Sequence, residues 1–377
     1  MICLSCPNGC HLSVVYESSH HVRIEGNKCD KGIAFAHAYL RNAGAQNLKI
    51  IRSEIKPVID PEMLISLCAC WGIKFKTTRP GLIPAGSPER TLFRIVIEDE
   101  QADLWAIEKI RPAAFQAKLK IIKTLDYLSR RGFSKVTPYL TGVNGLPIQE
   151  YASGLWQMVS FLPGEELDRQ SYMFDGWRAG VLSDVLIKIR EYSADIPFYC
   201  HEERFSIKEY IYNLKSQINV HRHELVPGIT PVISFLEKEF MVRYDSLDFS
   251  FCHGDFHPMN VIWGKNDIKT VIDWEFAGLK PEMYDLANMV GCLGIEHPSC
   301  LMREMVSDLI RQLQKAGIYE ERSWTYFLEL VISLRFAWLS EWLRKRDQDM
   351  IDMELEYMHL LLDNRIEILS HWGIDCK

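Results

Sequence analysis

The stretch that most constrains this chain is FCHGDFHPMNVIWGKNDIKTVIDWE, residues 251–275. Turn-forming residues surround Asp255 and Asn260, which stand five positions apart, and two short strand-like runs follow before Asp273. The pattern predicts an acidic loop, a strand, a turn and a second strand that ends in another acid. Taken one at a time, Asp and Asn residues here are also explained by turn chemistry alone.

The ordered set of Asp255, Asn260 and Asp273 has the composition that phosphoryl transfer requires. One carboxylate orients a hydroxyl and accepts its proton, while an amide and a second carboxylate hold magnesium on the nucleotide phosphates. Because the three residues come in the order and spacing typical of kinase signatures, we interpret them as one catalytic set and not as separate turn residues.

The motifs HGDFHPMN, VIDWEFAG and PEMYDLA resemble the catalytic core of the aminoglycoside phosphotransferase and choline kinase superfamily. The resemblance implies an α+β, bilobal, protein-kinase-like fold with a small β-rich lobe and a large helical lobe. It implies transfer of the γ-phosphate of ATP to a hydroxyl of a small molecule. Asp255 would be the catalytic base, Asn260 and Asp273 would hold Mg²⁺, and Asp285 would brace the catalytic loop.

Upstream residues occupy positions where this superfamily binds the nucleotide. Gly86 and Ser87 stand where a loop covers the phosphates, and backbone amides of such a loop can approach phosphate. Lys109, near the end of the apolar segment 103–110, resembles the lysine that contacts the α- and β-phosphates. Residues 139–149 and 155–161 are predicted to pair as a hairpin, and near its end the backbone of residues Met158 to Phe161 resembles the hinge that meets adenine. A strand-end lysine that reaches solvent is the alternative for Lys109.

One feature of the superfamily is missing. Its members pair the phosphate-binding lysine with a glutamate on the next helix, but the helix predicted over 113–130 has no acid before Asp126, which lies near its end. Either another carboxylate such as Glu108 forms the ion pair with Lys109, or the nucleotide phosphates alone hold Lys109 in place.

Four cysteines crowd the first thirty residues and predict a metal site. Cys3, Cys6 and Cys10 follow a C-x2-C-x3-C pattern, and Cys29 comes after a predicted hairpin with strands at 11–16 and 21–25. A hairpin returns its ends to one place, which brings Cys29 back to the other thiols. Four thiolates suit Zn²⁺ or a [4Fe-4S] cluster. Buried or redox-neutral cysteines are the alternative.

This cysteine segment also resembles the cluster-binding segment that opens molybdopterin-dependent oxidoreductases, where the same positions hold a [4Fe-4S] cluster. The chain departs from those enzymes after about thirty residues, so structural zinc stays equally consistent with the pattern. An electron-transfer subunit is a further reading, which rests on this module alone.

Length and composition limit the number of domains and the kinds of binding partner. The 377 residues suffice for two or three folding units, which we place at 1–45 (cysteine module), 46–162 (nucleotide-binding lobe) and 163–377 (helical lobe with the catalytic loop). The net charge of -7 argues against nucleic acid as a partner. The chain has no window of eighteen uncharged apolar residues, so we expect no membrane partner.

The compartment follows from the cysteines and the N-terminus. Eleven cysteines with a metal-like cluster favour a reducing cytoplasm over a disulfide framework. The start MICLSCPNGC lacks the basic and apolar regions of a secretion signal. The sequence therefore predicts a cytoplasmic enzyme that phosphorylates a small-molecule hydroxyl. The rival reading is a nucleotide-binding regulatory pseudokinase whose cysteine module senses redox state or metal.

Overall fold

The structure is a computed structural model that describes residues 13–16, 21–25, 49–50, 60–82, 91–169, 171–197, 200 and 204–375. The chain forms two compact units, 1–66 and 67–377. In the first unit, β1 (Ser13–Tyr16) pairs antiparallel with β2 (His21–Glu25), and β3 (Lys49–Ile50) runs parallel to β2. The hairpin predicted in the cysteine module is therefore confirmed.

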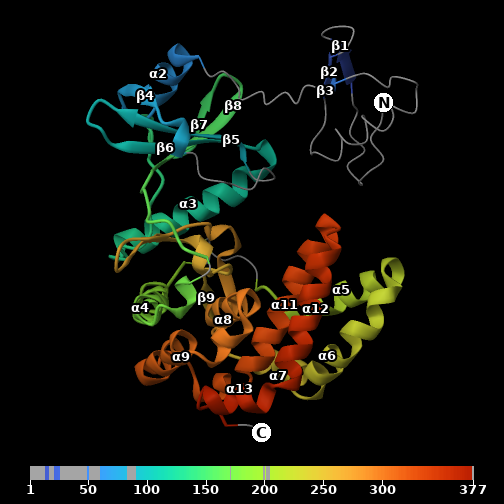
Figure 1. Cartoon of the computed structure of the whole chain (residues 1–377). Helices are drawn as coiled ribbons and strands as arrows, with labels where there is room; N and C mark the ends of the chain where they lie inside the picture. The colour runs from blue at the N-terminus through green and yellow to red at the C-terminus, as the bar shows by residue number, and fades with distance from the viewer. Residues whose placement is uncertain are drawn as a thin grey trace. The chain divides into compact units, whose positions relative to one another are not determined.

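The second unit begins within α2 (Pro61–Ala69) and opens on an antiparallel five-stranded sheet. Its strand order is β4-β5-β6-β8-β7, and each neighbouring pair is antiparallel (Figure 1). The strands are β4 (Phe75–Thr78), β5 (Thr91–Asp99), β6 (Leu104–Ile110), β7 (Gln149–Tyr151) and β8 (Gly154–Ser160). The long helix α3 (Phe115–Arg130) connects β6 to the rest of the sheet.

One strand expected from the sequence was wrong. Residues 139–149 were predicted to pair with 155–161 as a hairpin, but only an isolated bridge joins Tyr139 to Val159, and β7 begins at Gln149. Turns replace the expected strand because Asn144 and Gln149 exchange side-chain hydrogen bonds of 2.9 Å across the bend. Gly145 within that bend has a φ of 79°, a conformation that glycine adopts without strain.

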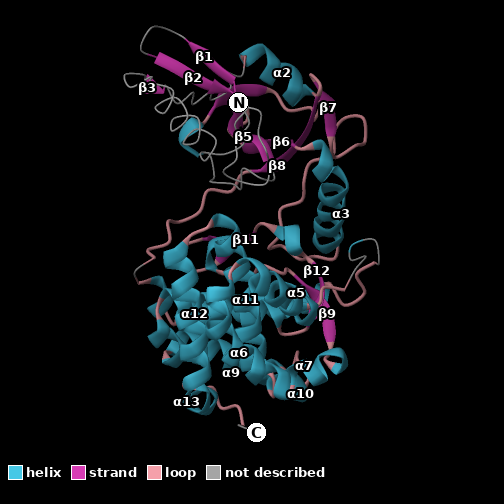
Figure 2. Cartoon of the chain, turned by 90° about the vertical axis from the view of Figure 1, so that its right-hand side faces the viewer, coloured by secondary structure: helices cyan, strands magenta, loops and turns pink. Residues whose placement is uncertain are grey.

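The remainder of the second unit is mainly helical, and Figure 2 shows these helices in cyan. Two short antiparallel pairs interrupt them, β9 with β12 and β10 with β11. The elements are α4 (Trp177–Tyr192), α5 (Ile207–His221), α6 (Val226–Lys238), α7 (Phe240–Arg243), β9 (Phe249–Cys252), β10 (Val261–Trp263), β11 (Ile268–Val271), β12 (Gly278–Pro281), α8 (Tyr284–Glu296), α9 (Glu304–Ala316), α10 (Glu321–Trp324), α11 (Phe327–Lys345), α12 (Gln348–Asp363) and α13 (Arg365–His371).

Several helix ends follow from local sequence. Ser206 caps α5 by accepting a 3.2 Å hydrogen bond from the backbone N–H of Glu209, in an S-x-x-E sequence typical of helix starts. Asp347 caps α12 by accepting from the backbone N–H of Met350 at 3.3 Å. Gly317 ends α9 in the left-handed conformation, at a φ of 63°.

The core of the helical lobe gathers around α11, which packs against α5, α8 and α12. Its buried apolar side chains join one large cluster with those helices. None of the described helices is long and apolar enough to cross a bilayer. A β-rich lobe followed by a helical lobe is the bilobal architecture expected from the sequence, which is therefore confirmed.

A buried ion pair joins α11 to α12 within this core. The Arg335 guanidinium donates through Nε to Glu354 Oε2 at 3.0 Å and through Nη2 to the other oxygen, and both side chains are 2% exposed or less. Trp342 Nε1 donates to the same carboxylate at 3.3 Å. Burial raises the pKa of Glu354, and the neighbouring Arg335 opposes that shift.

We expect Arg335→Met to destabilise the protein strongly, because it leaves the Glu354 carboxylate buried without its cation; the loss is about 3–5 kcal/mol. Without Arg335, the pKa of Glu354 in the folded protein should rise further above its value in the unfolded chain. At pH 5 the buried carboxyl can then take up a proton and lose its charge, so the loss of stability should be larger at pH 8 than at pH 5. Urea unfolding at both pH values measures this. The double variant Arg335→Met/Glu354→Leu is the control and should recover most of the stability; equal losses in the single and double variants would contradict the argument.

Candidate active site

The predicted catalytic loop follows strand β9, which pairs with β12 through Phe251 and Leu279. The loop then turns through a short 3-10 helix, Pro258–Asn260, into β10, and β10 pairs with β11 as the sequence predicted. Asp273 comes two residues after β11 ends. The two short strand pairs thus bring the residues of the catalytic set to the same part of the fold.

Asp285, in the first turn of α8, holds the start of this loop. Its two carboxylate oxygens accept the backbone N–H groups of His253 at 2.7 Å and Gly254 at 2.8 Å. Burial raises the pKa of Asp285 to about 6, although the two backbone hydrogen bonds oppose the shift. The bracing role expected for Asp285 matches these contacts.

Gly254 is required where it stands. Its φ is 85°, and a Cβ at this position would lie 2.1 Å from the backbone oxygen of Phe276. Any other residue would therefore push the catalytic loop away from the segment that follows Asp273.

The buried His253 links the loop to that same segment. Its Nε2 lies 2.9 Å from the backbone oxygen of Ile272, while Nδ1 accepts the backbone N–H of Asp255 at 3.2 Å, so Nε2 carries the proton. Burial lowers the pKa of His253 to about 4, and the ring packs edge-on against Trp274 with centroids 4.6 Å apart. A neutral His253 therefore positions Asp255 without adding charge beside it.

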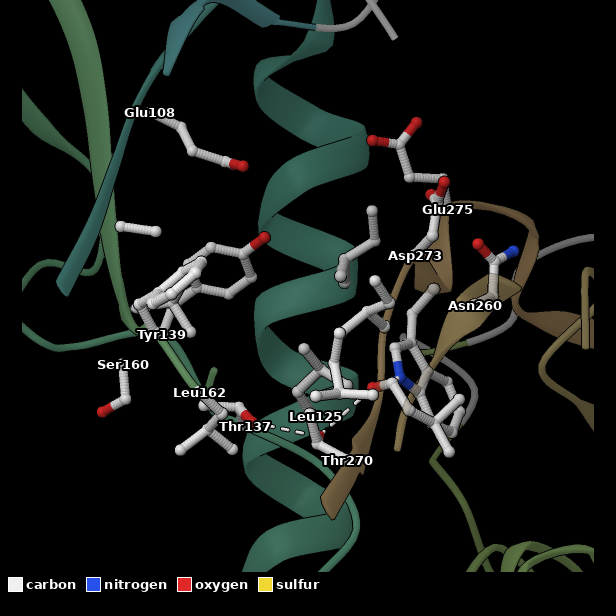
Figure 3. A pocket seen from close by; sticks show the side chains of 18 of the residues that line it. Glu108, Leu125, Thr137, Tyr139, Ser160, Leu162, Asn260, Thr270, Asp273 and Glu275 are labelled. Atoms are coloured by element: carbon white, nitrogen blue, oxygen red, sulfur yellow. Dashed lines mark hydrogen bonds between the residues drawn. The ribbon is translucent and has the colours of Figure 1, made fainter. Parts of the chain in front are cut away.

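Asn260 is tied directly to Asp255. Its side-chain nitrogen donates to the backbone oxygen of Asp255 at 2.8 Å and to the carboxylate oxygen Oδ2 at 3.0 Å. These two bonds fix the amide orientation, and Figure 3 shows the amide oxygen on the side of Asp273. Asp273 itself sits in the left-handed region at a φ of 62°, a conformation that Asp adopts more readily than most non-glycine residues.

The donors present at this point fit magnesium. Mg²⁺ prefers oxygen ligands and commonly takes one or two carboxylates together with substrate phosphates and water. The amide oxygen of Asn260 and the carboxylate of Asp273 supply such oxygens on one wall of a cavity. Within the described part of the chain, no three His, Cys, Asp or Glu side chains are grouped to hold a metal ion without such additional ligands.

This cavity has a volume of about 270 Å³ and extends from the sheet to the catalytic segment. Figure 3 shows Glu108 and Tyr139 on one side of α3, and Asn260, Asp273 and Glu275 on the other. Its polar and charged lining residues are Arg94, Glu108, Lys118, Thr137, Tyr139, Ser160, Asn260, Thr270, Asp273 and Glu275. A cavity with apolar walls and a few convergent charged groups is the usual form of a small-ligand site.

The expected hinge lies at one end of the cavity. Ser160, Phe161 and Leu162 line it, and the backbone N–H of Phe161 donates to Leu104 at 2.8 Å. Met158 does not line the cavity: its side chain is fully buried on the other face of β8, and its backbone oxygen accepts from Leu140 at 2.8 Å. Of the predicted hinge residues, Phe161 therefore lines the cavity and Met158 does not.

Lys109 is not brought to the cavity. Successive side chains of a strand point to opposite faces, so on β6 Ala106 and Glu108 face the cavity and Lys109 faces away. The Lys109 ammonium lies 5.3 Å from the ring centroid of Trp156. The sequence interpretation chose Lys109, but its neighbour Glu108 is the residue on the cavity face of β6. Gly86 and Ser87 lie outside the described residues.

Two cavity-facing ion pairs were not singled out from the sequence. Arg94 of β5 pairs with Glu108 through Nη2 at 2.5 Å, and Gln157 donates to the other carboxylate oxygen. Lys118 of α3 donates to Glu275 at 2.7 Å. The signal available was the alternation along DLWAIEKI, which puts Glu108 on the same strand face as Ala106 and so beside the cavity.

The other side of Asp255 faces the helical lobe. His257 Nε2 lies 3.7 Å from Asp255 Oδ2, and the His257 ring packs edge-on against Trp338 of α11 with centroids 6.0 Å apart. Trp338 is half-buried, and its Nε1 lies 3.4 Å from Asn288 Oδ1. The four metal-binding candidates Cys3, Cys6, Cys10 and Cys29 lie outside the described residues.

Comparisons with solved structures show the same fold. An aminoglycoside phosphotransferase from Alicyclobacillus acidocaldarius aligns at a TM-score of 0.57 and 12% identity, over 84% of this chain and 96% of that one. Aminoglycoside 2'-phosphotransferase-IIIa in its GDP complex aligns at a TM-score of 0.59 and 16% identity, over 81% of this chain and 97% of that one. Amicoumacin kinase hAmiN, solved with AMP-PNP, Ca²⁺ and Ami, aligns at a TM-score of 0.58 and 12% identity, over 83% of this chain and 96% of that one. At these identities the likeness concerns the fold.

Sequence comparison gives a second, independent result. No curated protein sequence matches the chain. The profile of the phosphotransferase enzyme family, however, matches residues 92–316, which run from β5 to the end of α9 and include the cavity and the catalytic loop. Because that match covers more than half of the chain, this protein belongs to the phosphotransferase enzyme family.

Proposed function

We propose that this protein is an ATP- and Mg²⁺-dependent phosphotransferase that moves the γ-phosphate to a hydroxyl of a small molecule. One observation carries the proposal: Asp255 is hydrogen-bonded to Asn260, and Asn260 and Asp273 line the same cavity. The family match and the fold support transfer to small molecules. Residues 46–162 would supply the nucleotide-binding lobe and residues 163–377 the catalytic lobe.

The proposed reaction assigns one task to each residue. Asp255 orients the acceptor hydroxyl and takes its proton as the hydroxyl oxygen attacks the γ-phosphorus. The bond from that phosphorus to the bridging oxygen breaks, and the electron pair leaves with ADP. Asn260 and Asp273 would hold Mg²⁺, which neutralises charge on the phosphate oxygens. Ser160 to Leu162 would bind the adenine end of the nucleotide.

The surroundings of Asp255 agree with a role as base. Its backbone is held by the neutral His253 and by the loop that Asp285 anchors, so the carboxylate is positioned without a permanent cation against it. The His257 ring lies beside it, with Nε2 3.7 Å from Asp255 Oδ2. A carboxylate that is positioned but not neutralised can accept a proton in the transition state.

The relatives indicate the class of ligand. The amicoumacin kinase was solved with a nucleotide analogue, a divalent cation and Ami, and the aminoglycoside 2'-phosphotransferase with GDP. We infer a hydroxyl-bearing acceptor of the aminoglycoside, homoserine or choline kind. A net charge of -7 also suits a cationic acceptor better than an anionic one.

A nucleotide-binding regulatory pseudokinase is the second candidate, and one observation favours it. Lys109 faces away from the cavity and a carboxylate, Glu108, stands in its place. ATP turnover with a panel of small alcohols and amino alcohols separates the two functions. Stoichiometric ADP formation with any acceptor supports the enzyme, whereas nucleotide binding without turnover across the panel supports the pseudokinase.

We expect Asp255→Asn to lower kcat by about a hundredfold or more and to leave the Kd of Mg-ATP nearly unchanged, because the amide cannot accept the proton. Steady-state kinetics with the best acceptor of the panel and calorimetric titration with Mg-ATP measure the two effects. Asp126→Asn is the matched control, since Asp126 is exposed and paired with Arg130 at 2.9 Å. Wild-type turnover in Asp255→Asn would remove the proposal.

Asp285→Asn should lower kcat with little change in nucleotide affinity, because one of the two backbone N–H groups loses a charged acceptor. Stability gives a second readout. The pKa of about 6 exceeds the ordinary value, so folded Asp285 binds protons that the unfolded chain releases. The stability of wild type relative to the variant should therefore fall as pH rises from about 4 to about 6. Urea unfolding across this range tests it, and a relative stability that rises over the same range contradicts it.

We also propose that Cys3, Cys6, Cys10 and Cys29 bind Zn²⁺ or a [4Fe-4S] cluster in a reducing cytoplasm, with residues 1–45 as a metal module. Metal analysis of anaerobically purified protein should find about one zinc or about four iron atoms per chain. A cluster adds broad visible absorbance, and zinc leaves the protein colourless. Cys6→Ser should lose the metal and Cys70→Ser should keep it. Protein without stoichiometric metal ends this proposal.

A further inference from the structure

A nucleoside triphosphate brings several negative charges into the cavity, and cations must face them. The lining residues with negative charge are Glu108, Asp273 and Glu275. Among the described lining residues, the positive charges are Arg94 and Lys118. The cavity therefore needs these two side chains, besides Mg²⁺, to bind a polyphosphate.

Lys118 stands beside the metal-binding residues. It lies in the first half of α3, is 5% exposed, and donates to Glu275 at 2.7 Å. Glu275 follows Asp273 by two residues, so the ion pair fixes the ammonium next to the carboxylate proposed to hold Mg²⁺. An ammonium has three N–H donors, and one bond to Glu275 leaves donors for phosphate oxygens.

Arg94 has a donor without an acceptor. Its Nη2 pairs with Glu108, its neighbour across the β5–β6 pair, but its Nε is buried and has no hydrogen-bond partner. A buried, unsatisfied N–H of a charged group is costly, so a ligand oxygen that accepts from it would be favoured. Arg94 lines the cavity, where such an oxygen would be placed.

The carboxylates that could repel phosphate are engaged by these same groups. Glu108 accepts from Arg94 on one oxygen and from Gln157 on the other. Glu275 accepts from Lys118. Each acid therefore directs its charge toward a cation that it holds in place, and the cation keeps free donors toward the cavity.

We propose that Lys118 of α3, assisted by Arg94 of β5, contacts the nucleotide phosphates, and that Glu275 and Glu108 position these two cations. The inference rests on the proposed function and deepens it, because it assigns the phosphate-binding role to a helix lysine and not to Lys109. The missing helix acid then has an explanation: α3 supplies the cation of the pair, and the acid comes from the segment after Asp273.

The test compares ligands that differ only in phosphate number. Calorimetric titrations of the full chain with Mg-ATP, Mg-ADP and AMP give the three dissociation constants. Lys118→Met should weaken the binding of Mg-ATP roughly tenfold or more and that of Mg-ADP less. The dissociation constant of AMP should change by no more than about twofold, because the lost bond is charge-assisted and goes to the distal phosphates. Lys118→Arg should recover part of the Mg-ATP affinity, which a purely structural role would not require.

Two further lysine variants make the result decisive. Lys109→Met should bind Mg-ATP as wild type does, and so should Lys123→Met, an exposed control on the same helix. The inference is overturned if Lys109→Met loses Mg-ATP affinity and Lys118→Met keeps it. It is also overturned if Lys118→Met weakens AMP as much as Mg-ATP.

A folding control and a second variant complete the design. Thermal unfolding shows whether Lys118→Met is folded, and if it is not, Arg94→Met takes its place with the same expected dependence on phosphate number. A wild-type protein that binds none of the three nucleotides would end the proposed function. A wild-type protein that binds Mg-ATP with an affinity unchanged by either substitution would end this inference alone.

Discussion

The two hydrogen bonds from the backbone of His253 and Gly254 to the carboxylate of Asp285 hold the whole site in place. They anchor the loop to α8, and Gly254 allows the loop to pass close to Phe276, whose backbone oxygen would lie only 2.1 Å from a Cβ at this position. His253 then reaches Ile272 and fixes the segment that carries Asp273. Loss of this bracing would disturb the proposed base and the proposed magnesium ligands together, since one chain of contacts positions both.

The catalytic loop was predictable from sequence because its residues are close together in the chain. Asp255 and Asn260 lie in one loop, and two short strands were expected between Asn260 and Asp273. The structure has those strands, β10 and β11. The bilobal fold followed from the same motifs. The helical lobe was also predictable, because apolar residues recur at helical spacing and caps such as Ser206 mark the boundaries.

The nucleotide side was less predictable because it depends on phase and on distant partners. A shift of one residue along a strand exchanges the two faces, and this error put Lys109 in the cavity instead of Glu108. Lys118 and Glu275 are 157 positions apart, so no local pattern signals their contact. The turns at 139–149 were missed for a related reason, since side-chain hydrogen bonds between Asn144 and Gln149 outweigh strand propensity there.

The charge pattern of the cavity bears on whether this protein transfers phosphate. A carboxylate at Glu108 with no cation nearby would repel ATP and favour a regulatory protein. Here Glu108 is held by Arg94 and Gln157, and a second cation, Lys118, pairs with Glu275. Under the proposed function, the cavity offers two cations for the phosphates and two oxygen ligands for Mg²⁺. A nucleotide-binding pseudokinase would need the same cations, so the residue that favours the enzyme is the proposed proton acceptor Asp255, which nucleotide binding alone does not require.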